Sequence, residues 1–354
     1  MFEEPPESLC IIRLSAIGDC VHTLPVVRSI QAAWPDTRIT WIIGKTEHAL
    51  FEGADGIEFI IFDKSAGWHA LIDVRRQLQG RRFPLLLHMH ASMRANLVSL
   101  MVRAKLRIGF DRPRARDRQW LFTNHKIPAV PRQHVMDGLF GFANEIGIER
   151  RDVVWDLPLA DADREYARNR ASRNQPVCVI SPCSSQRFRN FRNWSRENYI
   201  AVTRYMQSKY NAQVILTGGS TDAEYDYGQA ISAGTEPPVL NLIGQTSLKQ
   251  LAALLELSDL LICPDSGPAH MANAVGTSVI GLYATSNRHR TGPYDSQHLV
   301  VDAYPEAVKC ELGKPVDALR WGQRVRNPDA MDLIRVEDVC AKVDDVLGAL
   351  PERR

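Results

Sequence analysis

Short apolar runs alternate along the chain with stretches of helical periodicity. In the first half these runs lie at 9–14, 38–43, 58–62 and 85–89, and more polar helical stretches separate them. Short, nearly continuous apolar strands separated by helices are typical of a parallel sheet that is covered on both faces. The pattern therefore predicts a β/α/β domain at the start of the chain.

A second series of the same kind begins after a charged segment at 161–175. Its apolar runs lie at 177–180, 214–219, 260–263 and 278–283. Helical periodicity is found at 194–210, at 247–257, where Ser247 can act as the N-cap, and at 336–347. The sequence predicts two α/β domains at 1–165 and 166–330, followed by a C-terminal helix at 331–354.

The length and composition agree with this division. A chain of 354 residues exceeds what one hydrophobic core usually supports. An apolar fraction of 45% excludes a disordered or fibrous chain, and a net charge of +2 gives no support to nucleic-acid binding. The apolar runs are far shorter than the ~20 residues of a membrane helix. The acidic N-terminal stretch lacks the basic region of a signal peptide, so we expect a cytoplasmic enzyme with no transmembrane segment.

The seven cysteines favour a reduced protein. Cys10, Cys178 and Cys263 lie inside apolar runs, and the chain has no C-x-x-C pair. Scattered cysteines of this kind are more typical of core thiols than of a disulfide framework or a zinc site.

The loop after the first apolar run carries a candidate catalytic carboxylate. Its sequence at 15–19, SAIGD, places Gly18 at a tight turn and Asp19 in the first turn of the next helix. Ligands of doubly wound sheets bind where the carboxyl ends of strands lead into helices. Asp is also a common N-cap. Asp19 is therefore either a helix cap or a general base.

Two loops of the second half could hold a diphosphate. The sequence at 263–270, CPDSGPAH, combines Pro268, which suits a first helical turn, with Asp265, Ser266, Gly267 and His270. A helix N-terminus is a natural phosphate site, although a capped helix start would explain part of this pattern. The loop at 181–195 carries small polar residues and three arginines, namely Arg187, Arg189 and Arg192, which could neutralise a diphosphate or could simply be solvated.

A basic segment in the first half is a candidate docking site for an anion. Residues 103–118 contain seven Lys or Arg and two Asp, an excess of five positive charges. An anionic acceptor, an acidic membrane face or a nucleic acid would fit this charge, but no nucleic-acid reading motif accompanies it. His88 and His90 would share one face of a strand, and two histidines alone favour a structural or cleft-lining role over a metal site.

The sequence lacks the characteristic motifs of several enzyme classes. The chain has no G-x-G-x-x-G after a strand, no P-loop motif and no G-x-S-x-G elbow. These absences argue against nicotinamide dehydrogenases, P-loop NTPases and α/β-hydrolases.

Four motifs, in order along the chain, resemble a known family. They are the loop at 15–19, the R-N-W segment at 192–194, L-T-G-G at 216–219 and D-S-G-P-x-H at 265–270. Together they resemble the ADP-heptose:lipopolysaccharide heptosyltransferases of glycosyltransferase family 9, and the likeness covers roughly residues 11–283. The last motif is the most specific. The segment at 111–117 is similar to one carried by members that act on Kdo residues of the inner core, the heptosyltransferase I type.

The resemblance implies a GT-B fold, in which two Rossmann-like domains face each other across a cleft. It also implies inverting transfer of a heptose from ADP-heptose to an anionic Kdo/heptose inner-core acceptor, without a metal or another cofactor. The first domain would bind the acceptor and the second the ADP-sugar donor. We expect a cytoplasmic enzyme, peripheral at the inner membrane face.

Site residues follow from the resemblance position by position. Asp19 matches the general base. Donor positions are Ser184, Ser185, Arg192, Glu224, Asp265, Ser266, Gly267 and His270, and acceptor positions are Arg112, Arg114, Arg116 and His90. Two positions depart from the family pattern, because Arg192 replaces the usual Lys and Ser195 replaces a common Pro.

Two alternatives remain at this point. One is another GT-B enzyme, such as a transferase with a different nucleotide-sugar donor or a nucleotide-sugar epimerase. The other is a non-catalytic protein that binds a nucleotide sugar.

Overall fold

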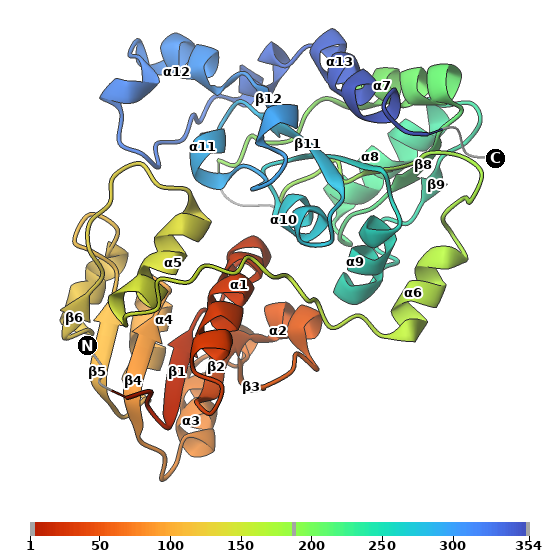
Figure 1. The fold of residues 1–354 in the computed structure, drawn as a ribbon. Coiled ribbons are helices and arrows are strands. Elements are labelled where there is room, and N and C mark those ends of the chain that lie inside the picture. The colour runs from red at the N-terminus through yellow and green to blue at the C-terminus, as the bar shows by residue number, and fades with distance from the viewer. Residues whose placement is uncertain (1–3, 186–188, 352–354) are drawn as a thin grey trace. The chain divides into compact units, whose positions relative to one another are not determined.

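The computed structural model describes residues 4–185 and 189–351 and divides the chain into two compact units between Pro158 and Leu159. Each unit is built around one six-stranded sheet (Figure 1). The boundary predicted after residue 165 falls inside helix α6 (Asp161–Arg168). This helix packs against α9 (Leu248–Glu256), so it belongs to the second unit.

The sheet of the first unit is entirely parallel. Its strands are β1 (Ser8–Ile12), β2 (Arg38–Gly44), β3 (Ile57–Phe62), β4 (Phe83–His88), β5 (Ala104–Gly109) and β6 (His125–Lys126), in the order β3-β2-β1-β4-β5-β6. Strand β1 is central, and Leu9 pairs with Ile39 on one side and Leu85 on the other. The side chains of β1 after Ser8 are completely buried, as the continuous apolar run predicts.

Helices cover both faces of this sheet. They are α1 (Ile17–Ala33), α2 (Lys45–Phe51), α3 (Trp68–Gln77), α4 (Met93–Ser99) and α5 (Val135–Glu145), with short 3₁₀ segments at η1 (Lys64–Ala66) and η2 (Arg116–Leu121). Helix α1 packs on α5. Ala70 and Val74 of α3 and Ala95 and Val98 of α4 join Cys10 and Ile12 of β1 in one hydrophobic cluster.

The second unit repeats the plan. Its strands are β7 (Val177–Ile180), β8 (Gln213–Leu216), β9 (Leu240–Asn241), β10 (Leu260–Pro264), β11 (Ser278–Tyr283) and β12 (Val301–Asp302), all parallel in the order β12-β11-β10-β7-β8-β9. Its further helices are α7 (Arg196–Tyr210), α8 (Asp222–Ala233), α10 (Gly267–Ala274), α11 (Arg288–Thr291), α12 (Tyr304–Leu312) and α13 (Val336–Leu347), with η3 (Gln297–Leu299), η4 (Val316–Ala318) and η5 (Pro328–Leu333). The terminal helix α13 packs against α7 (Figure 1).

The expected strands and helices are confirmed to within a few residues, and Ser247 caps α9 as predicted. Four strands were not predicted. Strands β6, β9 and β12 have two residues each, and β5 coincides with the predicted basic segment because it contains Lys105 and Arg107. All seven cysteines are free thiols; five of them are buried, as expected of core thiols, whereas Cys310 is exposed and Cys340 is partly exposed.

Numbered within each unit, both sheets have the strand order 3-2-1-4-5-6 of a dinucleotide-binding fold. The order reverses between β1 and β4 in the first unit and between β7 and β10 in the second. Loops that leave the carboxyl ends of these two pairs of strands are where such sheets bind ligands. Across the described stretches 4–185 and 189–351, none of the helices combines the length and the apolarity required to cross a bilayer.

Candidate functional site

Asp19 lies at the switch point of the first unit, in the first turn of α1. The N-cap is Ala16, which has no side chain that can cap, and Asp19 is the third residue of the helix. The Asp19 carboxylate accepts a hydrogen bond from the backbone N–H of Ala16 at 3.5 Å. The interpretation of Asp19 as the N-cap is therefore wrong in position, although its side chain does bind a backbone N–H at the helix start.

A buried arginine fixes this carboxylate. Arg13, in the loop directly after β1, forms an ion pair with Asp19 Oδ2 and donates from Nη1 to the Met89 carbonyl at 2.5 Å. Met89 follows β4, so Arg13 ties the two strands of the switch point together. The Arg13 side chain is 9% exposed and that of Asp19 is 34% exposed. The ion pair fixes the position of the carboxylate, and the carboxylate still reaches solvent.

The sequence motifs assign no role to Arg13. A usable signal was present, because Arg13 is a charged residue inside the otherwise apolar run at 9–14. A charged side chain at the end of a buried strand needs a partner, and Asp19 is the acidic residue of the adjoining loop.

His90, two residues after β4, adds a neutral ring to the groups at this switch point. Its Nδ1 accepts a hydrogen bond from the backbone N–H of Leu14 at 3.1 Å. Burial, with the positive charge of Arg13 as the next cause, lowers the pKa of His90 to about 3. A neutral imidazole that accepts at Nδ1 carries its proton on Nε2, so His90 offers an N–H donor at this position.

His88 has a structural environment. It is completely buried at the end of β4, and its Nε2 lies 3.0 Å from Oδ1 of Asn96 on α4. Burial lowers the pKa of His88 to about 3. The structural alternative raised for the histidine pair therefore describes His88.

The three arginines assigned to acceptor binding differ in their surroundings. Arg114 forms an ion pair with Asp111 and donates to Gln133 Oε1 and to the Pro128 carbonyl, each at 3.1 Å, so its role in this structure is to hold the loop. Arg112 is exposed, with its guanidinium 4.1 Å from the ring centre of Trp120. Arg116 is also exposed.

The predicted basic segment is not one continuous surface. Its first half is strand β5, and Arg107 is partly buried, donating to the carbonyls of Phe122 at 2.9 Å, Val102 at 3.0 Å and Ser99 at 2.7 Å. An alternation of charged and apolar residues at 104–109 was the available signal for this strand. The exposed basic side chains of the segment are Arg103, Lys105, Arg112, Arg116 and Arg118, whereas Arg107 and Arg114 are partly buried.

Arg192 occupies the switch point of the second unit. It lies in the loop after β7 and donates from Nη1 to the carbonyl of Asp265, directly after β10, at 2.5 Å. The same nitrogen lies 3.2 Å from Asp265 Oδ2, and Nε donates to Asn190 Oδ1 at 2.6 Å. The side chains of Arg192 and Asp265 are 10% and 8% exposed. Arg187 of the same loop lies outside the described residues.

Ser184 is held by two asparagines, Asn190 and Asn193, to which the sequence motifs gave no role of their own. Its backbone N–H and hydroxyl both donate to Asn193 Oδ1, at 2.8 and 3.1 Å, and its hydroxyl accepts from Asn190 at 2.8 Å. Asn190 also donates to the carbonyl of Ser185, at 2.7 Å. Ser185 itself is exposed. These bonds shape the loop around Arg192.

Helix α10 starts immediately after Asp265. Ser266 is its N-cap residue but its side chain makes no capping bond, Gly267 is the first helical residue and Pro268 follows. His270 is buried within the first turn and a half. The carboxylate of Asp265 faces Arg192 and, at 3.9 Å, Arg324, which the sequence analysis did not assign. The structure thus gathers Arg192, Arg324 and the positive end of α10.

Glu224, one of the positions assigned to donor binding, caps its own helix. It is the third residue of α8, accepts from the Gly219 N–H at 2.7 Å and from the Thr221 hydroxyl at 2.7 Å, and receives a weaker bond from the Thr221 N–H at 3.3 Å. A carboxylate has about four acceptor positions, so one remains for a further donor.

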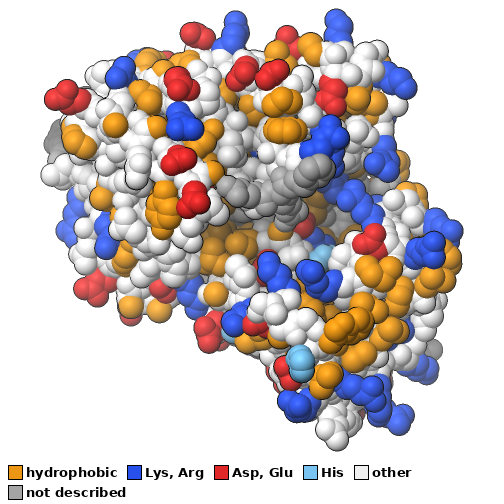
Figure 2. All heavy atoms as spheres, turned by 180° about the vertical axis from the view of Figure 1, so that it is seen from behind, with side chains coloured by type: hydrophobic (Ala, Val, Ile, Leu, Met, Phe, Trp, Pro, Cys, Tyr) orange, Lys and Arg blue, Asp and Glu red, His pale blue; other side chains and the backbone are white. Residues whose placement is uncertain are grey.

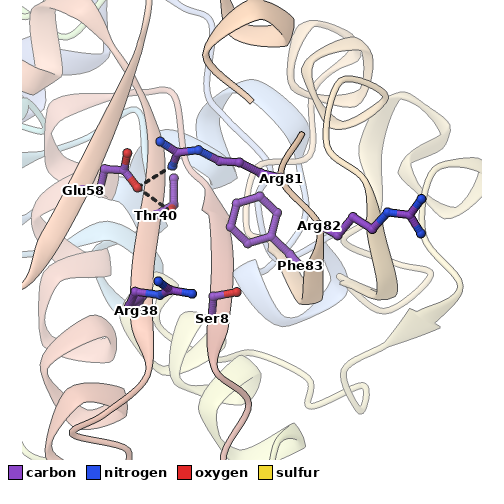
Figure 3. A pocket seen from close by; sticks show the side chains of 7 residues that line it. All are labelled: Ser8, Arg38, Thr40, Glu58, Arg81, Arg82 and Phe83. Carbon is purple, nitrogen blue, oxygen red and sulfur yellow. Dashed lines mark hydrogen bonds and ion pairs between the residues drawn. The ribbon is translucent and has the colours of Figure 1, made fainter. Parts of the chain in front are cut away.

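A separate pocket of about 370 Å³ opens at the amino-terminal edge of the first sheet (Figure 3). Arg81 pairs with Glu58 at 2.6 Å, and Thr40 donates to the same carboxylate oxygen at 3.1 Å. The Arg81 guanidinium lowers the pKa of Glu58, while Arg82 is directed away from the pair. The pocket lies away from the carboxyl ends of the strands, and its central charges neutralise each other. Over 4–185 and 189–351, no group of three or more His, Cys, Asp or Glu forms a metal cluster.

The chain is similar to proteins of one enzyme family. The model of glycosyltransferase family 9 (heptosyltransferase) matches residues 71–317. The chain is 39% identical over 343 residues to the lipopolysaccharide core heptosyltransferase OpsX of Haemophilus influenzae, covering 97% of this chain and 98% of that protein. It is 23% identical to lipopolysaccharide heptosyltransferase 3 of Escherichia coli, covering 93% and 96%.

Solved structures show the same fold. A glycosyltransferase of family 9 from Veillonella parvula superposes with a TM-score of 0.80 at 18% identity, covering 97% of this chain and 98% of that one. The E. coli heptosyltransferase WaaC with ADP gives a TM-score of 0.73 at 16% identity, covering 96% and 99%. The fold is thus that of GT-B enzymes, as expected, and the chain belongs to glycosyltransferase family 9, the heptosyltransferase family.

Proposed function

We propose that this enzyme transfers a heptose from an ADP-linked donor to the inner core of a lipopolysaccharide, with inversion at the sugar carbon. The observation that carries the proposal is the carboxylate of Asp19, partly exposed and fixed by Arg13 at a ligand-binding switch point. A relative at 39% identity that is named a lipopolysaccharide core heptosyltransferase supports the acceptor class.

Asp19 acts as the general base. Its carboxylate accepts the proton of the acceptor hydroxyl, and the acceptor oxygen forms a bond to the anomeric carbon of the donor sugar. The bond from that carbon to the diphosphate oxygen breaks, and ADP leaves with the electron pair. General-base assistance contributes about 10²- to 10⁴-fold to the rate. The mechanism requires both half-sites to engage one donor–acceptor pair.

The second unit binds the donor and stabilises the leaving group. Arg192 and Arg324 supply positive charge, and the start of α10 supplies backbone N–H groups beside His270. Stabilisation of the departing diphosphate by fixed charges of this kind is usually the largest electrostatic contribution to such a reaction. These groups provide the counter-charge without a metal. Ser184, Ser185 and Glu224 line the phosphate and ribose positions, and a relative with this fold has been solved with ADP.

The first unit binds the anionic acceptor. The exposed guanidiniums of Arg112 and Arg116 attract its carboxylate or phosphate groups. Arg114 shapes the loop that presents them, and the Nε2–H of His90 donates to an acceptor oxygen beside Asp19. We place the enzyme in the cytoplasm, associated peripherally with the inner membrane.

The test is the substitution Asp19→Asn, assayed with ADP-heptose and a Kdo-containing acceptor. We expect turnover to fall about 10²- to 10⁴-fold, while ADP binding to the second unit is unchanged. Asp73→Asn, which removes an exposed carboxylate from an ion pair with Arg76 in the same unit, is the matched control and should keep its activity. Near-normal turnover of Asp19→Asn would remove Asp19 from the mechanism.

A panel of nucleotide sugars separates the remaining alternatives. An epimerase would convert a nucleotide sugar without any acceptor. A different transferase would prefer a UDP- or GDP-linked donor, and a non-catalytic binding protein would bind the donor and modify nothing. The proposal predicts product only when ADP-heptose and acceptor are both present.

A further inference from the structure

Large hydrophobic side chains are exposed together on one side of the first unit. The most exposed are Trp68 at 74% and Ile72 at 53% on α3, Leu100 at 57% directly after α4, and Leu121 at 59% in η2. Met93, at 45%, and Trp120, at 41%, belong to α4 and η2. Figure 2, which views the molecule from behind, shows hydrophobic side chains gathered beside Lys and Arg on this unit. Contiguous exposed apolar area of this kind marks an interaction site in a soluble domain.

The three elements form one surface. Helices α3 and α4 cover the same face of the sheet and share one hydrophobic cluster. Helix α4 is joined to η2 because Asp117 accepts from the Met93 N–H at 2.9 Å and its carbonyl accepts from Asn96 at 2.8 Å. We call the outer face of α3, α4 and η2, with Leu100, the α3–α4–η2 surface.

Positive charge surrounds these hydrophobic side chains. Six exposed arginines lie on the same elements or next to them, namely Arg75, Arg76, Arg94, Arg103, Arg116 and Arg118. The acidic residues of the three elements are Asp73, which pairs with Arg76 at 3.0 Å, and Asp117, which accepts the Met93 N–H. Arg112 stacks on Trp120 and adds a further charge. The surface is therefore both apolar and strongly cationic.

We propose that the α3–α4–η2 surface docks the first unit on an anionic lipid bilayer. Tryptophan is favoured at the boundary between headgroups and acyl chains, and exposed Ile and Leu side chains insert just below it. Arginines at the same level bind lipid phosphates, and the negative surface potential of an anionic leaflet attracts them. A purely apolar protein interface would not need the ring of arginines, and an anionic soluble ligand would not need the exposed tryptophans.

The position of the surface connects it with the acceptor half-site. Helix α4 begins three residues after His90, and Arg94 of α4 lies close enough to His90 for its charge to contribute to the lowered pKa of that ring. Docking through this surface would hold the first half-site near the bilayer that carries a lipid-linked acceptor. The inference rests on the proposed function, because it names the surface through which the peripheral association with the membrane would take place.

The direct test is co-sedimentation of the full-length protein with vesicles. The wild type should bind vesicles of phosphatidylcholine containing phosphatidylglycerol and bind pure phosphatidylcholine weakly. Trp68→Ser/Ile72→Ser should bind the anionic vesicles at least about tenfold more weakly, because two inserted side chains are lost. Arg75→Glu/Arg103→Glu should lose the preference for anionic vesicles. Tyr225→Ser/Leu257→Ser, which removes two exposed hydrophobic side chains of the second unit, is the matched control and should bind like the wild type.

The result that overturns the proposal is wild-type protein that binds neither vesicle, or Trp68→Ser/Ile72→Ser that binds as well as wild type. Equal binding of the wild type to both kinds of vesicle would overturn the proposed preference for anionic lipid. If the wild type is a dimer in solution and Trp68→Ser/Ile72→Ser is a monomer, a second copy of the chain occupies the surface instead of a bilayer.

Turnover on a deacylated, water-soluble acceptor separates this proposal from the proposed function. Turnover on this soluble acceptor should be unchanged in Trp68→Ser/Ile72→Ser, because these residues lie outside the catalytic site. Activity of the same variant on a vesicle-bound acceptor should be lost.

Discussion

The two units use the same arginine clamp at their switch points but expose different groups. In each, an arginine in the loop after the first strand donates to a main-chain carbonyl after the fourth, Arg13 to Met89 and Arg192 to Asp265. In each, the same arginine pairs with an aspartate. The aspartate of the first unit is 34% exposed, whereas that of the second is 8% exposed.

This difference in exposure separates two kinds of chemistry. A carboxylate that is fixed and still reaches solvent can take a proton from a substrate, as Asp19 is proposed to do. A carboxylate buried between two arginines neutralises and orients them, and this is the environment of Asp265. The shared topology therefore fixes where the charged residues lie, and the two aspartates differ in their exposure to solvent.

The surfaces of the two units differ as well. Within 4–185 and 189–351, the large hydrophobic side chains that are exposed belong to the first unit, except for Tyr225 and Leu257. The first unit is the one proposed to meet a lipid-linked acceptor. The second unit is proposed to bind a water-soluble nucleotide sugar, and binding of such a ligand does not require exposed hydrophobic side chains.

The strongest way to break the comparison is to neutralise the buried aspartate. Asp265→Asn should lower the free energy of unfolding of the second unit by about 3 kcal/mol, because it leaves the buried charge of Arg192 without its carboxylate. Asp19→Asn should cost about 1 kcal/mol, because water can replace a partly exposed partner. Amide hydrogen exchange, resolved by segment, measures both. Equal losses would mean that the two aspartates are not distinguished by burial.

A smaller effect is expected when Arg192, the switch-point arginine of the second unit, is replaced by lysine. Arg192→Lys restores the residue usual in the family and keeps the charge, but one ammonium cannot reach both Asn190 and the Asp265 carbonyl as the guanidinium does. We expect ADP binding to weaken about 10-fold, the loss of roughly one charged hydrogen bond, in isothermal titration calorimetry. Arg189→Lys in the same loop is the control. Unchanged affinity for Arg192→Lys would show that charge alone suffices at this position.

The effect that is smallest near neutral pH, and that accumulates only as the solution is acidified, concerns the stability of the first unit. The pKa of His88 is lowered to about 3 by burial, so the unfolded chain binds a proton below about pH 6.5 that the folded unit does not. Stability should therefore be constant above pH 6.5 and fall between pH 6.5 and 3, by up to about 1.4 kcal/mol per pH unit from this group. Hydrogen exchange of β4 should show the slope, and His88→Gln should reduce it. A slope that His88→Gln leaves unaltered would place its origin elsewhere.

Sequence patterning predicted the two parallel sheets because buried strands such as 9–14 and 177–180 leave nearly unbroken apolar runs. It missed β5, whose Lys105 and Arg107 interrupt the run, and it missed two-residue strands that are too short for any periodicity. It assigned the candidate residues Asp19, Arg192 and His270 from local motifs and a family resemblance. It did not assign Arg13, although a charge inside the apolar run at 9–14 was a usable signal. It did not find Arg324, because its partner Asp265 lies far away in the sequence and is recognisable only when the chain is folded.

The amino-acid sequence by itself determined the fold class, the family and the loops in which charged and small residues gather. These are local properties, set by hydrophobic periodicity and short motifs. The tertiary structure alone decided that Arg13 reaches Met89, 76 residues away, that Asp265 is buried while Asp19 is not, and that Glu224 caps its helix. Burial and ion pairing depend on which strands become neighbours, and that pairing joins segments far apart in the chain.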